Sequence, residues 1–442
     1  MASGGGWYAY NPPMASGEDS KAEWGRFPLV AIAVSLLISL AVAVAFDRGH
    51  RNESLFKLAN WVGPTAESLL HGNGMAVAIG QPPQDVVFHA ARMPVASAVV
   101  AVGVKLLGDS FLRVGVFKAV LLLVPVWLAM VLVWRSSRRE MRWLVSLLLV
   151  APFFVLPFLA DVVNMQVEEG YSYSCLALAV GMLLFRERWA NRGIGWGILF
   201  AALLDALYLA KSSMALVVVV LVMGYLMVER RAAMRVAVVL LVVAAPVSWA
   251  VWQHHASGRY SVGTSLDGFN LHKGNFEQFL EVYPPQGGRT LDDSDNLLQG
   301  NCVMTDEWQQ SDCQKAAGVA FIEEHPRATV RADLRKFEVF FFSVTKSGSA
   351  ETKGMMSIAE TGGLVVFRLL FWGSLLIAGG AIVTGRSVGR KVGLIYWGVV
   401  LACAAPYVVG FAYTRHASVL VYPAVLLCCR ALLPVPRVKN IA

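Results

Sequence analysis

Charged residues are scarce in this chain, and their scarcity restricts the kind of protein it can be. Only 15% of the 442 residues are Asp, Glu, Lys or Arg, whereas 56% are hydrophobic. A soluble globular domain carries about 25% charged residues, because its surface faces water. The composition excludes an ordinary soluble domain and is typical of a polytopic membrane protein. The net charge of +8 does not indicate nucleic-acid binding, since most arginines lie in short loops between apolar runs.

Cysteine is also scarce, with six residues in the whole chain. Cys302 and Cys313 lie in one long polar segment, where an oxidising outer compartment would permit a disulfide between them. Two free thiols are the alternative. No His or Cys cluster accompanies this pair, which argues against a zinc site. The other four lie in apolar runs and are expected to pack as small apolar side chains: Cys175, Cys403, Cys428 and Cys429.

About ten apolar runs approach the 20 residues that a helix needs to cross a bilayer. We therefore predict an all-α polytopic membrane protein, with a single transmembrane domain over residues 27–442. Residues 1–26 are rich in Gly and Ser and are predicted to form a disordered tail. The predicted spans are 27–46, 111–134, 143–162, 171–186, 194–210, 212–228, 235–253, 364–384, 392–411 and 417–434.

Positive charge alternates along the chain, which predicts the orientation of these spans. The segment before the first span and the loops after every second span are basic, and short basic loops face the cytoplasm. Both termini are therefore predicted to be cytoplasmic, and the Arg-rich inner loops suit a bacterial inner membrane. The basic residues are Lys21 and Arg26; Arg135, Arg138, Arg139 and Arg142; Arg186, Arg188 and Arg192; Arg230, Arg231 and Arg235; Arg386, Arg390 and Lys391; and Arg437 and Lys439.

Two long loops, 47–110 and 254–363, are predicted to lie on the outer face. The first contains a segment at 53–70 whose apolar and charged residues alternate as in helices lying in the membrane interface. The apolar segment 94–108 is too short for a full span and is predicted to lie against the membrane. The second loop is mixed: 260–271 resembles β-structure, whereas 318–324 and 327–342 are predicted helices. The sequence contains no inverted repeat of the kind that favours a transporter.

Asp47 follows the first span directly and opens the first outer loop. An acid fixed at the outer mouth of a membrane protein can act as a general base toward a lipid-borne substrate. The alternative is a charged residue that marks a helix end. Two further acids, Glu168 and Glu169, lie in the outer loop after the third span, and Glu53 is the next acid after Asp47.

Basic residues recur at the outer ends of the spans. Arg92 and its neighbour His89 close the first outer loop, Lys211 lies between two spans, and Arg415-His416 lies in the last outer turn. Each of these sites could bind a phosphate, for which the fork of Arg donors is well suited. The alternative for each is an interfacial anchor.

Two weaker candidates complete the set. His272 and Lys273 lie in the second outer loop and could line a sugar site. Asp205 lies within a span, where an acid is costly unless it faces a polar cavity or a partner. Together the acids and cations predict one outer cavity, with a base on one side and phosphate-binding cations on the other.

The order of these motifs resembles integral-membrane glycosyltransferases of the GT-C superfamily. The chain is most similar to bacterial relatives of the protein O-mannosyltransferases and the lipid A aminoarabinose transferases. The resemblance spans most of residues 27–434. Its motifs are Asp47 after span one, Arg92-Met-Pro94 leading through Leu106-Leu-Gly-Asp-Ser110 into span two, Leu209-Ala-Lys-Ser-Ser213, Thr264-Ser-Leu-Asp-Gly-Phe-Asn-Leu-His-Lys-Gly-Asn275, Glu323-Glu-His-Pro326, and Arg415-His416 before an apolar helix with Pro423.

The resemblance implies a polyprenyl-phosphate-linked sugar as donor and inversion at its anomeric carbon. It implies that Asp47 deprotonates a hydroxyl of a glycan, lipid or protein acceptor, while Arg92, Lys211 and Arg415 neutralise the leaving phosphate. Many relatives carry an acidic pair after the first span, but here Asp47 is followed by Arg48. This departure leaves a divalent metal without support, and it leaves open a contribution from Glu53, Glu168 or Glu169. No cofactor is expected to be required.

Two other functions remain open at this stage. An O-antigen ligase or polymerase type of protein would use a lipid-linked glycan with its essential residues in the late outer loop. A transporter of lipid-linked glycans would place its essential residues at mid-membrane depth, where only Asp205 is suited to that role.

Overall fold

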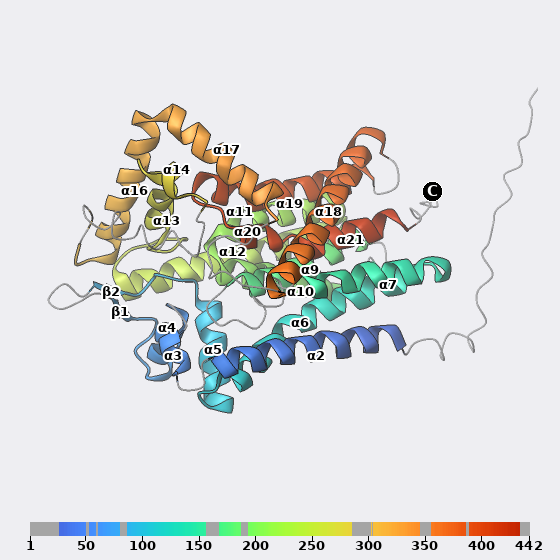
Figure 1. Cartoon of the computed structure of the whole chain (residues 1–442), viewed down its shortest axis with the longest axis horizontal. Coiled ribbons are helices and arrows are strands. Elements are labelled where there is room, and N and C mark those ends of the chain that lie inside the picture. The colour runs from blue at the N-terminus through green and yellow to red at the C-terminus, as the bar shows by residue number, and fades with distance from the viewer. Residues whose placement is uncertain are drawn as a thin grey trace, which may run out of the picture.

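A bundle of long apolar helices forms most of the computed structural model (Figure 1). The structure describes residues 26–49, 53–58, 61–79, 86–155, 168–186, 193–284, 302, 304–344, 355–385 and 389–433. The predicted tail before residue 26 and the basic residues after position 433 lie outside the described residues. The start of α2 and the end of α21 lie at the same end of the bundle (Figure 1).

Each predicted span coincides with helical structure within the described ranges. α7 (Arg142–Val150) continues into the 3-10 turn η2 (Ala151–Phe154), and 156–162 of that span lie outside the described residues. The turn η4 (Ser212–Met214) leads into α11 (Ala215–Val228). The others are α2 (Arg26–Gly49), α6 (Phe111–Ser136), α9 (Glu169–Leu184), α10 (Gly193–Ala210), α12 (Ala232–Ser257), α18 (Met355–Thr384), α19 (Arg390–Val409), α20 (Thr414–Ser418) and α21 (Val421–Ala431).

The lengths of these helices confirm an all-α, multi-pass membrane protein. Five helices in the described part of the chain are long and apolar enough to cross a membrane: Phe111–Ser136, Gly193–Ala210, Ala232–Ser257, Glu360–Thr384 and Arg390–Val409. Four shorter apolar helices accompany them: Leu29–Ala45, Pro94–Leu107, Arg142–Phe153 and Ser212–Val228. The total of ten crossings stays a prediction.

The described elements of the two long loops gather at one end of the bundle (Figure 1). The first loop forms α3 (Leu55–Leu58), α4 (Val62–Leu70), the antiparallel pair β1 (Val77–Ile79) and β2 (Val86–Phe88), and α5 (Pro94–Leu107), with Val77 opposite Phe88 and Ile79 opposite Val86. The second forms α13 (Asp267–Lys273), α14 (Phe279–Val282), α16 (Glu307–Glu324) and α17 (Pro326–Phe342).

Two predictions for the second loop need correction. The segment 260–271 was predicted to resemble β-structure, but it contains the start of α13. The reason is local: Asp267 is the first residue of α13, where a carboxylate is favourable, and it accepts from both the N–H and the hydroxyl of Thr264, which fixes the turn before the helix. The helix predicted at 318–324 begins earlier, at Glu307, because the Asp306 side chain accepts from the Trp308 and Gln309 amides.

α9 is the innermost helix, and every one of its residues is buried. It packs against α6, α10 and α21. Small side chains along it, such as Ser174, Ala177 and Gly181, let these neighbours approach closely. Its N-terminus therefore places Glu168 and Glu169 inside the bundle, at the end where the two long loops meet.

Candidate functional site: a charged cavity at the N-terminus of α9

A cavity of about 480 Å³ opens beside the first turn of α9. This volume lies within the usual range for small-molecule sites. Its walls come from the end of the first long loop, the turn between α10 and α11, the segment 262–271, and the region from Pro406 to His416. The ionisable side chains among its lining residues are Arg92, Glu168, Glu169, Tyr208, Lys211, Asp267, Tyr407, Arg415 and His416.

Glu169 is the centre of the charged cluster. Its Oε1 lies 2.6 Å from Lys211 Nζ, 3.5 Å from His416 Nε2 and 3.7 Å from Arg415 Nε. Burial by itself would raise the pKa of Glu169, but the charges of Lys211 and Arg415 outweigh it and hold the pKa below its usual range. The N-terminal end of α9 favours the same ionised form. Glu169 is therefore a carboxylate that ties three basic groups together.

Lys211 reaches this cluster because α10 ends one residue earlier. Its backbone is extended, and its N–H still donates to the Leu207 and Tyr208 carbonyls at the end of the helix. Burial lowers the pKa of Lys211, but the charge of Glu169 raises it by a larger amount, so the pKa lies above its usual value. The ammonium also lies 5.5 Å from the centre of the Tyr407 ring. Lys211 is thus a fixed positive charge at the cavity wall.

His416 is held by a hydrogen bond at the edge of its ring and by a stacked tyrosine. Its Nδ1 accepts from the Tyr413 N–H at 3.1 Å, and its ring stacks on Tyr407 with 4.0 Å between ring centres. Burial and the positive charge of Lys211 lower its pKa well below 6.5. The imidazole is therefore neutral at neutral pH, and the accepting role of Nδ1 puts the proton on Nε2, toward Glu169.

Arg92 and Glu168 form a second, looser pair at the edge of the cavity. Arg92 Nη1 lies 3.6 Å from Glu168 Oε2, and the two side chains are 35% and 7% exposed. The Oε1 atom of Glu168 is buried and has no hydrogen-bond partner among the described residues. A buried carboxylate oxygen left unpaired is costly, so this atom is suited to receive a donor from a bound molecule.

The position of Arg92 depends on the second long loop. Both carboxylate oxygens of Glu307, at the start of α16, accept from consecutive backbone amides: His89 N–H at 3.0 Å and Ala90 N–H at 3.1 Å. The Ser265 N–H also donates to the Ala90 carbonyl at 2.9 Å. Glu307 is buried, with 2% exposure. These bonds join the chain just before Arg92 to α16 and to the segment 262–271, which lines the cavity.

The structure brings six of the predicted site residues together at this cavity: Arg92, Glu168, Glu169, Lys211, Arg415 and His416. Asp47 is not among the lining residues. Its Oδ1 accepts from the Leu112 N–H at 3.3 Å, so it caps the start of α6. Glu53 and His89 also lie outside the lining. The role of Asp47 as general base therefore stays a hypothesis.

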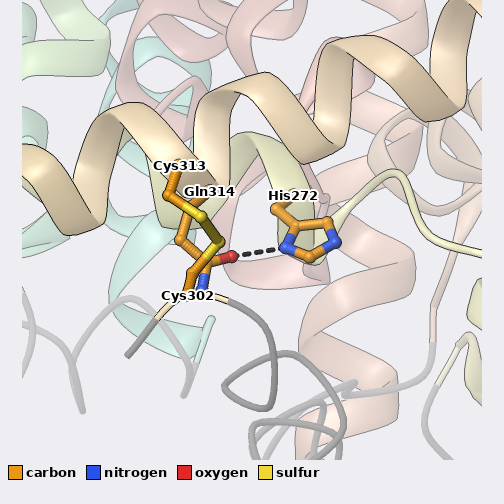
Figure 2. The surroundings of a disulfide bond; sticks show 4 residues. All are labelled: His272, Cys302, Cys313 and Gln314. Carbon is orange, nitrogen blue, oxygen red and sulfur yellow. Dashed lines mark hydrogen bonds between the residues drawn. A yellow bond between two sulfur atoms is a disulfide. The ribbon is translucent and has the colours of Figure 1, made fainter. Parts of the chain in front are cut away.

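His272 and Lys273 are likewise absent from the cavity lining. The His272 ring bonds to the side chain of Gln314 on α16, next to the disulfide that joins Cys302 to Cys313 (Figure 2). Lys273 is buried, and its ammonium lies 5.4 Å from the Phe269 and Phe411 ring centres. His272 thus helps to hold α13 against α16.

Three ionisable lining residues were not predicted as individual candidates: Asp267, Tyr208 and Tyr407. Asp267 accepts from Thr264, and Ser212 Oγ donates to it at 3.3 Å, so it joins the second loop to the turn after α10. The spacing Thr-x-x-Asp is a known helix-start signal and could have indicated its position. The two tyrosines lie in apolar runs, where no sequence signal separates them from packing residues.

Metal binding has no dedicated cluster in the described part of the chain. No group of three or more His, Cys, Asp or Glu side chains there lies close enough to hold an ion. Glu168 and Glu169 are engaged with Arg92 and Lys211 instead. The expectation that no cofactor is required stays a prediction.

No family model and no curated protein sequence matches the chain. The solved structures similar to it include the archaeal oligosaccharyltransferase AglB from Archaeoglobus fulgidus in complex with an inhibitory peptide and a dolichol-phosphate. That likeness has a TM-score of 0.44 and 10% identity, and covers 92% of this chain and 50% of the other. The apo form of an oligosaccharyltransferase from the same organism has a TM-score of 0.44 and 12% identity, and the likeness covers 93% of this chain and 50% of the other. ArnT from Cupriavidus metallidurans, in the apo state, has a TM-score of 0.34 and 13% identity, and the likeness covers 91% of this chain and 77% of the other.

This chain thus spans about half the length of the two archaeal proteins. At these TM-scores the likenesses assign neither an activity nor a substrate to this chain, and the case for its function rests on the cavity.

Proposed function

We propose that this protein transfers a sugar from a polyprenyl-phosphate-linked donor to a hydroxyl group of an envelope glycan, lipid or protein, with inversion at the anomeric carbon. The observation that supports this most directly is the composition of the cavity wall. Arg92, Lys211 and Arg415 line the same space as Glu168 and Glu169. Group transfer from a lipid phosphate needs cations for the departing phosphate and a carboxylate for the attacking hydroxyl.

The cations would act on the leaving group. When the bond between the sugar and its phosphate breaks, negative charge grows on the phosphate oxygen. Fixed positive groups in a site screened from water stabilise that charge. Lys211 is held by Glu169 at 2.6 Å, and the Arg415 side chain is 36% exposed, so the arginine is the more accessible cation. We assign the phosphate to the wall formed by Lys211, Arg415 and the neutral His416.

The membrane setting supports a lipid-borne donor. Nucleotide sugars are cytosolic, so a transferase that works on the outer face needs a sugar already carried across on a lipid. Residues of both predicted outer loops line the cavity, and the described elements of these loops gather at one end of the bundle (Figure 1). We propose a bacterial inner-membrane protein with both termini in the cytoplasm and its site on the periplasmic side.

The test compares envelope glycans by mass spectrometry in cells that carry the wild-type protein, no protein, Arg415→Gln or Arg327→Gln. Arg327 is exposed on α17, outside the cavity lining, and is the matched control. We expect one sugar unit to disappear in the deletion and the Arg415→Gln strain and to persist with Arg327→Gln. Unchanged glycans in the deletion strain would refute the proposal, provided the wild-type protein is present in the membrane.

One observation favours a second candidate, a transporter of lipid-linked glycans. Asp205 lies within α10, and its Oδ1 is buried without a hydrogen-bond partner among the described residues. An acid at this depth is a functional candidate by default. A transporter would fail with Asp205→Asn and tolerate the loss of Arg415, which is the reverse of the expected pattern. An O-antigen ligase type of protein would depend mainly on residues of the second long loop.

A further inference from the structure

Three carboxylates line the cavity, and they differ in how their oxygens are used. Glu169 is bound by Lys211 and faces Arg415 and His416. Both oxygens of Asp267 accept hydrogen bonds, one from the Thr264 N–H and the other from the Thr264 and Ser212 hydroxyls. These two side chains have structural partners that fix them.

Glu168 differs from both. Its Oε2 lies 3.6 Å from Arg92, a distance longer than a direct hydrogen bond, while its Oε1 has no partner among the described residues. The residue is 6% exposed and lines the cavity. A carboxylate that is buried, close to an arginine and unpaired at one buried oxygen lacks the hydrogen bond that a bound hydroxyl could supply.

We infer that Glu168 is the general base that accepts the proton of the acceptor hydroxyl. This inference rests on the proposed glycosyl transfer and names the residue that activates its nucleophile. Glu168 precedes Glu169 at the start of α9, where successive side chains point about 100° apart. The proposed base and the cation cluster around Glu169 therefore contact different parts of the cavity, which leaves room for the acceptor and the leaving phosphate to be bound separately.

The chemical step balances with these groups alone. The acceptor oxygen forms a bond to the anomeric carbon while the bond from that carbon to the phosphate oxygen breaks. The electron pair of the broken bond leaves with the phosphate, toward Lys211 and Arg415. The hydroxyl proton passes to Glu168 Oε1. The products are the glycoside, polyprenyl phosphate and a protonated Glu168, which returns its proton to water or to the departing phosphate.

Asp47 is the competing assignment, and its surroundings differ. Its Oδ1 already accepts the Leu112 N–H at the start of α6, and it does not line the cavity. A general base must come within hydrogen-bond reach of the proton it removes. Glu168 meets that condition for a molecule bound in this cavity.

The experiment uses the full-length protein in lipid nanodiscs with radiolabelled polyprenyl-phosphate sugars of the hexose and pentose classes, and with the glycan, lipid and protein fractions of the envelope as acceptors. We expect Glu168→Gln to lower kcat at least 100-fold with less than a threefold change in KM for the donor, because general-base catalysis contributes about 10²–10⁴-fold. Glu168→Asp keeps a carboxylate one methylene further back and should recover part of the rate. Glu67→Gln, exposed on α4 and outside the cavity lining, is the matched control.

The outcomes separate the inference from the proposed function. A wild-type protein that never cleaves the donor refutes the transferase proposal itself. A wild-type protein that transfers sugar while Glu168→Gln matches its kcat overturns only the assignment of Glu168. Loss of activity in Asp47→Asn together with full activity in Glu168→Gln would move the base to Asp47. Thermal unfolding of every variant shows whether a rate loss reflects unfolded protein, and Glu168→Asp carries the test if Glu168→Gln does not fold.

Discussion

The ion pair between Lys211 and Glu169 makes a stability prediction that can be worked out from its burial. The two side chains are 14% and 3% exposed, and their charged atoms lie 2.6 Å apart. Removing one member of such a pair leaves the other charge buried without compensation, which costs about 3–5 kcal/mol. Lys211→Met and Glu169→Met should each destabilise by this amount. At roughly 2 °C per kcal/mol, the apparent Tm should fall by about 6–10 °C.

The double variant tests the physical reasoning more sharply. Replacing both charges by apolar side chains removes the uncompensated charge, so its loss should be smaller than the sum of the single losses by at least about 1 kcal/mol. The assay is thermal unfolding in detergent at one fixed scan rate, because membrane proteins unfold irreversibly. Arg259 and Asp312 form the control pair, also at 2.6 Å but 43% and 58% exposed. Their double variant should change little, since exposed pairs contribute about 0–1 kcal/mol.

Additive losses at Lys211 and Glu169 would refute this account, as would single losses no larger than those of the control pair. Either result would mean that water or lipid reaches the two charges and screens them, despite their low exposure. Arg415 also faces Glu169, at 3.7 Å, so the Glu169→Met variant is expected to lose at least as much as Lys211→Met.

Three further predictions concern the surroundings of the cavity. The pKa of His416 is lowered in the folded protein, so below about pH 6.5 the imidazole binds a proton in the unfolded protein but not in the folded one. The free energy of unfolding should therefore fall from pH 7 to pH 5, and His416→Gln should flatten the dependence of Tm on pH. Glu307→Gln replaces one of the two oxygens that accept backbone N–H groups by an NH₂ group, which cannot accept. We expect the free energy of unfolding to fall by about 1–3 kcal/mol and the polyprenyl-phosphate sugar to bind more weakly in a titration. Cys302→Ser with Cys313→Ser opens a disulfide with a sequence separation of 11 and should cost about 2–3 kcal/mol in a comparison of Tm values.

The helices that cross the membrane could be predicted from the sequence because one force dominates there. A segment such as Phe111–Ser136 must be apolar and about 20 residues long to span a bilayer, and both properties are visible in the residues themselves. The second long loop was harder. The composition of 260–271 suggested β-structure, but a helix begins at Asp267, whose carboxylate accepts from the N–H and the hydroxyl of Thr264.

The site was predictable in kind but not in arrangement. Lys211 and Arg415 stand out because a charge between two apolar runs is rare, and both line the cavity. Asp47 stands out for the same reason, yet it caps α6. A charged residue at the end of a span can either cap a helix or bind a ligand. Only its neighbours in the folded structure show which of these two roles it has. Glu168 and Glu169 adjoin in sequence but differ in every contact.

The assembly of the cavity depends on contacts between distant parts of the chain. Glu307 binds His89 and Ala90 across 218 and 217 residues, and Lys211 reaches Glu169 across 42. Arg92 follows the clamped amides by two residues, so its distance to Glu168 is set by the docking of one outer loop on the other. The Ser265 N–H, which donates to the Ala90 carbonyl, is a second bond between the same two loops. Glu307→Gln should therefore loosen the segment before Arg92 without releasing it, and it should alter the 3.6 Å approach of Arg92 to Glu168.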